Sequence, residues 1–156
     1  AAPDRPRAIG DTEREEVLQT IRQVFSTGGP RDRETALRDI SQALGHQRLG
    51  KNVRATLEGD LLAAVRRGVL ENTPEGYRLL ARTFAEYQRD HLKASFLSAI
   101  GRTWVTREEA IRLLTRHLGF ARTSAEMQET GRSLINGLIR TGDLEVDGKE
   151  LVRRVG

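Results

Sequence analysis

Apolar residues recur three or four positions apart in three successive stretches of the first half of the chain, a spacing typical of amphipathic helices. The first stretch follows Asp11–Thr12, a candidate capping pair, and stops at the turn-forming residues 26–30. The second follows Asp32, a typical N-cap residue, and stops at Gly45. The third begins at about Lys51 and is the longest. The pattern therefore predicts three helices.

Beyond Gly68 the helical spacing ends and short apolar runs take its place. Val69–Leu70 and Tyr77–Leu80 flank a turn-forming stretch at 72–76, which predicts a small β-hairpin. The second half of the chain shows the same succession of three helices and a hairpin. The turn of that second hairpin is assigned to Asp147–Gly148, a dipeptide that favours the type I′ geometry.

An internal repeat relates the two halves of the chain. Residues 33–71 align with residues 107–145 without a gap, each pair lying 74 positions apart, and 12 of the 39 pairs are identical. The identities include a Leu-Gly step after each second helix and an Arg-x-Gly-x-Leu step after each third helix. In the second copy, Thr106 and Ser124 are the candidate N-caps. The alignment predicts two similar units in tandem.

Two helices, a turn, a long helix and a two-stranded hairpin form the plan of a winged helix-turn-helix. The predicted fold class is therefore mainly α with small β-hairpin wings, as two tandem winged helix-turn-helix domains. We expect a disordered leader over 1–10, a first domain over 11–81, a helical connector over 82–90 and a second domain over 91–156. Phe84 and Tyr87 of the connector can pack against either domain.

Composition narrows the functional classes. The 156 residues carry 26 Lys and Arg against 22 Asp and Glu, and there is no cysteine, which excludes disulfides and thiolate chemistry. No apolar run approaches the ~20 residues of a membrane helix, so we expect a cytoplasmic protein without a membrane partner. The spacing of His46, His91 and His117 matches no metal motif, and no cofactor, catalytic group or small-molecule substrate is predicted.

The turn and the start of the third helix in the first unit form a basic edge. In a helix-turn-helix this edge enters the major groove of DNA. Arginine can bind guanine or phosphate, and asparagine can bind adenine. Duplex DNA is therefore the expected partner, with these candidate contacts in the first unit: Arg48, Lys51, Asn52, Arg54 and, in the hairpin, Arg78.

The corresponding edge of the second unit is less basic. Arg122 and Arg132 are its candidate DNA contacts, but Glu126 and Glu129 balance their charge. We expect the first unit to be the better DNA reader, and the second unit either to support it or to bind a protein partner.

One near-match to a nucleotide-binding motif is rejected. Residues 45–52 nearly spell the phosphate-binding loop G-x-x-x-x-G-K-[ST], but Asn52 replaces the hydroxyl residue that would bind magnesium. The stretch also follows a predicted helix, whereas that loop must follow a strand. A nucleotide site is therefore not expected here.

The first unit resembles a small domain of unknown function near the C-terminus of large bacterial proteins that combine a superfamily 1 helicase with a restriction-endonuclease-like nuclease. The resemblance rests on Gly29-Pro30, Leu44-Gly45, Arg48-Leu49-Gly50 and the stretch 64–70. The second unit lacks the Gly-Pro and has Ser124 in place of Gly50. The resemblance implies an accessory DNA-binding module of a larger DNA-processing or phage-defence protein, with catalysis elsewhere in the parent chain.

Two other functions compete with DNA binding. A protein–protein scaffold would use the second unit, the connector around Phe84 and Tyr87, and the helix edge near Met127. A transcriptional regulator would need a dimer and a palindromic site. Charges on an exposed helix face can also serve solvation alone, so the sequence leaves these alternatives open.

Overall fold

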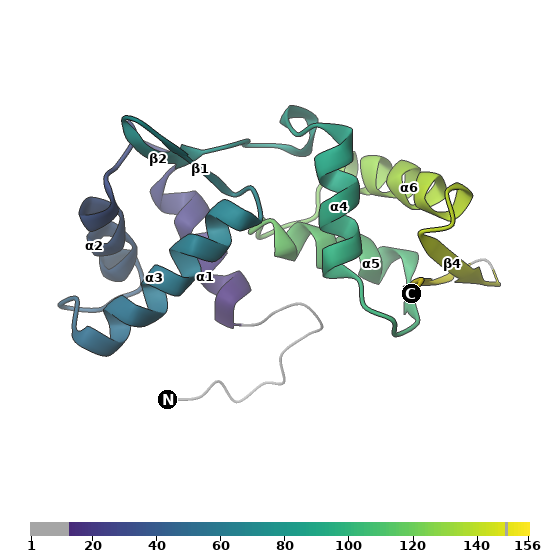
Figure 1. The fold of residues 1–156 in the computed structure, drawn as a ribbon, viewed down its shortest axis with the longest axis horizontal. Helices are drawn as coiled ribbons and strands as arrows, with labels where there is room; N and C mark the ends of the chain where they lie inside the picture. Colours follow the sequence, from purple (N-terminus) through teal and green to yellow (C-terminus); the bar gives the residue numbers. More distant parts are fainter. Residues whose placement is uncertain (1–12, 149) are drawn as a thin grey trace.

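The structure is a computed structural model that describes residues 13–148 and 150–156. The expected leader (1–10) and the candidate capping pair Asp11–Thr12 lie outside the described residues. The described chain forms two groups of elements, over residues 13–79 and 84–154, which lie side by side (Figure 1). They adjoin where α1 (Glu13–Val24) contacts α5 (Arg107–His117).

The first group, called here the first unit, has three helices and a hairpin. Its elements are α1 (Glu13–Val24), α2 (Arg33–Ala43), α3 (Lys51–Arg66), β1 (Leu70–Thr73) and β2 (Gly76–Leu79). The second unit follows a short 3-10 turn, η1 (Phe84–Glu86). Its elements are α4 (Arg89–Ala99), β3 (Val105–Thr106), α5 (Arg107–His117), α6 (Ala125–Arg140), β4 (Leu144–Asp147) and β5 (Leu151–Arg154).

The repeat is visible in the bounds of these elements. α2 and α5, α3 and α6, and β1 and β4 each begin and end 74 residues apart. In the second unit β3 pairs with β5, with Val105 opposite Val152. The first unit has an isolated bridge at the equivalent place, where Arg31 and Tyr77 exchange two backbone hydrogen bonds of 3.0 and 2.8 Å. The predicted mainly helical chain with small antiparallel hairpins is confirmed.

The caps that the sequence predicted set these bounds. Asp32, Thr106 and Ser124 each accept a hydrogen bond from the backbone N–H three residues later, at the starts of α2, α5 and α6. These bonds satisfy donors that a helix leaves unpaired at its first turn. The three predicted N-caps are confirmed.

Each unit has its own hydrophobic core. Leu37 of α2 and Leu61 of α3 are buried in the first core, against α1. Leu114 of α5 and Leu134 of α6 are buried in the second core. The second core also contains Phe84 and Tyr87 of the connecting segment, so this segment packs with the second unit.

The predicted helical connector over 82–90 is wrong. Only Phe84–Glu86 forms a single 3-10 turn, Tyr87 is extended, and α4 begins at Arg89. Phe84 and Tyr87 are 1% and 8% exposed. Burying these two aromatic rings favours this kinked path over the helical one, because the helix propensity of a short segment is a weak force beside such burial.

The turn of the second hairpin also differs from the prediction. Asp147 pairs with Leu151 in the ladder, so Asp147 belongs to the strand and Asp147–Gly148 is not a two-residue turn. A type I′ turn needs positive φ at both central residues. No described non-glycine residue has positive φ, whereas Gly148 does, at +66°.

The guanidinium of Arg22 joins the two units. It projects from α1 and donates hydrogen bonds to the carbonyls of Leu118 (2.6 Å) and Ala81 (2.8 Å) and to the hydroxyl of Tyr87 (2.8 Å). Its carbon lies 3.7 Å from the centroid of the Phe120 ring, a cation–π contact. Burial lowers the pKa of Arg22, and three acceptors compensate the cost of burying its charge.

Tyr87 extends this junction to the end of α3. Its hydroxyl donates to the carbonyl of Gly68 at 2.5 Å, and its ring stacks on His91 with centroids 5.0 Å apart. Gly68 has φ of +79°, and a Cβ there would overlap the ring of His91. Glycine is therefore required at this position both by the left-handed turn and by the contact between units.

Arg67 makes the third link between the units. It bonds to Glu15 of α1 at 2.8 Å and donates to the carbonyl of His117, at the end of α5, at 3.4 Å. Burial and the neighbouring Arg67 lower the pKa of His117 to about 4, although Glu15 acts in the opposite direction. The junction thus contains a histidine held neutral at physiological pH.

We predict that Arg22→Leu destabilises the protein by about 3 kcal/mol or more, because it leaves buried carbonyls without their donor. Leucine is the residue at the equivalent position, Leu97, if the repeat is extended back through the first helix. Urea denaturation measures the change. Arg38→Leu, at an exposed position of α2, is the matched control and should shift the free energy of unfolding by at most ~0.5 kcal/mol. Equal effects of the two substitutions would refute the role of Arg22.

His117 should make stability fall with acidification. Its folded pKa lies below its ordinary 6.5, so the unfolded chain takes up the proton first. The stability that the neutral His117 contributes is present above pH 6.5 and is lost as the pH falls toward 4. The free energy of unfolding should fall by an amount on the order of 2–3 kcal/mol over this range. Urea denaturation between pH 7.5 and 4 should show a steeper loss in the wild type than in His117→Gln. Parallel pH profiles would contradict the prediction.

Candidate nucleic-acid interface

The N-terminal end of α3 is an open helix end. Gly50 is its N-cap, with extended backbone and no side-chain hydrogen bond to the first turn, and that turn contains no acidic residue. The first N–H groups of a helix lack partners within the helix, and the positive end of its dipole lies there. This end of α3 is therefore suited to an anion.

Two of the predicted cations flank this end of the helix. Arg48 precedes Gly50 in the turn and Lys51 follows it, and both are exposed. Within residues 13–148 and 150–156, neither side chain makes a hydrogen bond or an ion pair. Their charges are thus available to a ligand at the start of α3.

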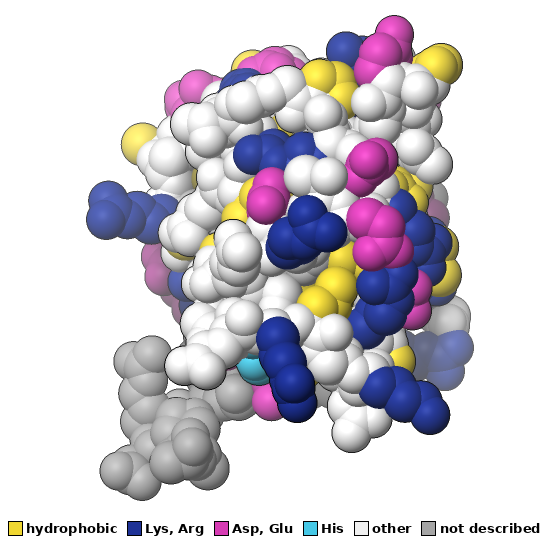
Figure 2. Space-filling model, turned by 90° about the vertical axis from the view of Figure 1, so that its left-hand side faces the viewer, with side chains coloured by type: hydrophobic (Ala, Val, Ile, Leu, Met, Phe, Trp, Pro, Cys, Tyr) yellow, Lys and Arg dark blue, Asp and Glu magenta, His cyan; other side chains and the backbone are white. Residues whose placement is uncertain are grey.

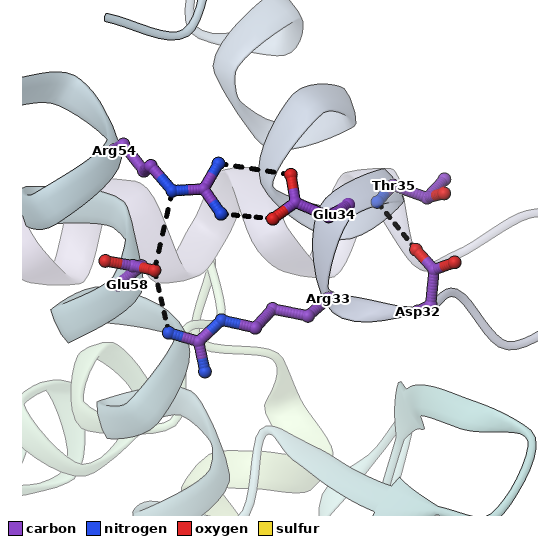
Figure 3. A network of polar contacts seen from close by, with 6 residues as sticks. All are labelled: Asp32, Arg33, Glu34, Thr35, Arg54 and Glu58. Atoms are coloured by element: carbon purple, nitrogen blue, oxygen red, sulfur yellow. Dashed lines mark hydrogen bonds and ion pairs between the residues drawn. The ribbon is translucent and has the colours of Figure 1, made fainter. Parts of the chain in front are cut away.

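Arg54, the third predicted cation, is engaged by carboxylates (Figure 3). Its guanidinium donates to both carboxylate oxygens of Glu34 on α2, one of them at 3.1 Å. It also lies 3.7 Å from Glu58, one turn further along α3. Glu58 in turn accepts from Arg33 of α2 at 2.8 Å. The network connects α2 to α3.

The charges of this network stabilise one another. The hydrogen bond from Arg54 lowers the pKa of Glu34, and the bond to Glu34 raises the pKa of Arg54. The bond to Glu58 likewise raises the pKa of Arg33. Sequence spacing placed Arg54 beside Lys51 but gave no sign of the two carboxylates that meet it.

The other predicted residues of the first unit lie apart from this helix end. Asn52 is exposed and lines a cleft between α1 and α3, on a different side of α3 from Arg54. Arg78 bonds to Glu71, its cross-strand neighbour in the hairpin, at 2.9 Å and remains 58% exposed. The five predicted contacts of the first unit therefore do not form one continuous surface.

The start of α6 in the second unit is a closed helix end. The hydroxyl of Ser124 already accepts a hydrogen bond from the N–H of Met127, and Glu126 lies in the first turn. Arg122 is exposed in the preceding turn. Arg132 lies further along α6 and donates to Gln128 at 3.2 Å. The two units thus differ at the helix end where their sequences also differ, Gly50 against Ser124.

Seen from the side of the first unit, Lys and Arg side chains alternate with Asp and Glu side chains (Figure 2). No broad basic field covers this face. Local geometry, such as the open end of α3, therefore determines where an anion can bind on it.

The described part of the chain holds no metal-binding cluster, and residues 45–52 do not form a nucleotide-binding loop. Among its residues no group of three or more His, Asp and Glu side chains could hold a metal ion. Residues 45–52 connect two helices, unlike a phosphate-binding loop, which follows a strand. None of the described helices combines the length and the apolar character that a membrane span needs.

No protein-family model, curated protein or solved structure matches this chain. The resemblance of the first unit to the domain of helicase–nuclease proteins therefore stays a prediction.

Sequence reasoning missed the junction around Arg22 and Arg67. Position-by-position comparison of the two copies holds a signal for it, because Arg22 aligns with Leu97 and Arg67 with Thr141.

The network at Arg54 should contribute little to stability, and its contribution should depend on salt. We expect Glu58→Gln to lower the urea midpoint slightly in 50 mM NaCl, because both Arg33 and Arg54 lose their shared carboxylate. In 1 M NaCl, where exposed ion pairs are screened, the wild type and the variant should unfold at the same midpoint. A large effect that persists in 1 M NaCl would contradict this interpretation.

Proposed function

We propose that this chain is a tandem winged-helix module that binds duplex DNA without catalytic activity of its own. The single observation that carries the proposal is the open N-terminal end of α3, where Arg48 and Lys51, which have no partner among the described residues, flank Gly50. The resemblance noted above extends the proposal to a cytoplasmic, accessory part of a larger bacterial DNA-processing or defence protein.

The order of elements supports the winged-helix part of the proposal. Each unit runs helix, short extended segment, helix, helix, strand, strand, and the extended segment bonds to the last strand in both. In this plan α3 and α6 are the recognition helices and the two hairpins are the wings. The N-terminal end of a recognition helix faces the DNA.

The proposed contact is mainly to phosphates. The first N–H groups of α3 would bind one phosphate while Arg48 and Lys51 neutralise its charge and that of a neighbour. Phosphate contacts give affinity without sequence preference and make binding depend strongly on salt. Asn52 is the neighbouring group with an amide that could bind adenine.

The experiment is a mobility shift with random duplex DNA over a salt series. Arg48→Glu with Lys51→Glu should weaken binding at least about tenfold and reduce the salt slope by about two, because each lost phosphate contact removes ~0.9. Arg66→Glu with Arg82→Glu makes the same charge change at exposed positions that are not candidate contacts and should have a smaller effect. Equal losses would contradict the site, and no binding by the wild type at low salt would contradict the function.

One observation favours protein binding as a second candidate function. Leu62 of α3 is 61% exposed, and the equivalent residue of α6 is Asn136. An apolar side chain is buried favourably against the apolar surface of a protein, whereas the major groove of DNA offers it only the thymine methyl group. Sedimentation of the wild type and of Leu62→Asn distinguishes the two functions. A stable wild-type dimer that the substitution dissociates, together with no mobility shift of DNA, favours protein binding.

A further inference from the structure

The second unit contains a basic groove that the sequence comparison did not indicate. It lies between α5 and α6 and has a volume of about 690 Å³. Three arginines from the two helices line it, together with Gln128 and the carboxylates of Glu108 and Glu150. The arginines are Arg107, Arg112 and Arg132. Three guanidinium groups against two carboxylates give the groove a net positive charge.

The network of Figure 3 occupies the equivalent place in the first unit. There Arg54 spans from α3 to Glu34 of α2, and Glu58 binds Arg33. In the second unit Gln128 stands in place of Arg54, and Arg132 in place of Glu58. The two exchanges remove the ion pairs that connect the helices and turn a central acidic position into a basic one.

Two hydrogen bonds of the groove arginines go to neutral amide oxygens. Arg132 donates to the amide oxygen of Gln128 at 3.2 Å, and Arg107 donates to that of Asn136 at 3.2 Å. A neutral amide oxygen binds a guanidinium less strongly than a carboxylate or phosphate oxygen does. An anion entering the groove can therefore replace these bonds with stronger ones.

We propose that this groove binds phosphates of a nucleic-acid backbone. The planar guanidinium group matches the geometry of a phosphate, and arginines on two helices can hold one phosphodiester from both sides. The second unit would then contact DNA along α5 and α6, whereas the first unit contacts it at the open end of α3. This inference rests on the proposed DNA-binding function and extends it to the unit with the closed helix end.

The decisive variant copies the network of the first unit into the second. Gln128→Arg with Arg132→Glu provides the arginine and the carboxylate that connect the helices in the first unit. We expect this pair to weaken binding to duplex DNA about fivefold and to reduce the salt slope by about one. Arg82→Gln makes the same net change of charge at an exposed site and should change binding by less than about twofold.

The reciprocal variant, Arg54→Gln with Glu58→Arg, should open the groove of the first unit and strengthen binding. A variant that carries all four substitutions has the net charge of the wild type. Any change in its DNA affinity therefore reflects the positions of the charges and not the total charge. Circular dichroism and urea denaturation verify that each variant folds. If the Gln128→Arg/Arg132→Glu variant (the copy-in variant) folds and binds DNA as tightly as the wild type, the groove is not a DNA contact, while the proposed function stands.

A second readout tests the groove even if the chain binds no DNA. The arginine Nε–Hε signals of the wild type are followed by nuclear magnetic resonance during titration with inorganic tripolyphosphate. Signals that move in the wild type but not in the copy-in variant support an anion groove, and signals that move in neither overturn it. If the Gln128→Arg/Arg132→Glu variant loses binding to a poly-glutamate peptide but keeps its binding to DNA, the ligand of the groove is an acidic protein and the nucleic-acid assignment is overturned.

Discussion

The half-buried guanidinium of Arg22 links the two units where they lie against each other. It belongs to α1, yet its three acceptors lie in the second unit and in the segment that leads to it. A guanidinium keeps its charge under almost all conditions, so its removal from water must be offset by acceptors such as these three. The path of the connecting chain brings Ala81 and Tyr87 to this one group, and Tyr87 extends the contact to Gly68.

The junction also accounts for two positions at which the copies of the repeat differ. Both copies need the same apolar positions, because each has a separate core of three helices. Polar positions outside the cores are free to differ, and Arg22 and Arg67 join the units where their counterparts are Leu97 and Thr141. The differences between the copies thus mark the residues that act outside the core.

The same principle applies to the candidate nucleic-acid contacts. An arginine beside two carboxylates supports the packing of α2 against α3, as Arg54 does. Arg132, at the position of Glu58 in the other copy, lies in an open groove instead. Charge along the chain therefore says little about binding until the partners of each side chain are known.

The sequence by itself determined the helices, their caps, the hairpins and the repeat, because local spacing and glycine or hydroxyl residues at helix ends control them. It also identified Arg48 and Lys51 at an open helix end. Only the tertiary structure decided the path at Phe84 and Tyr87, the pairing of Arg54 and the groove at Arg132. These depend on side chains distant in sequence, whose burial and charge balance exist only once the helices have packed.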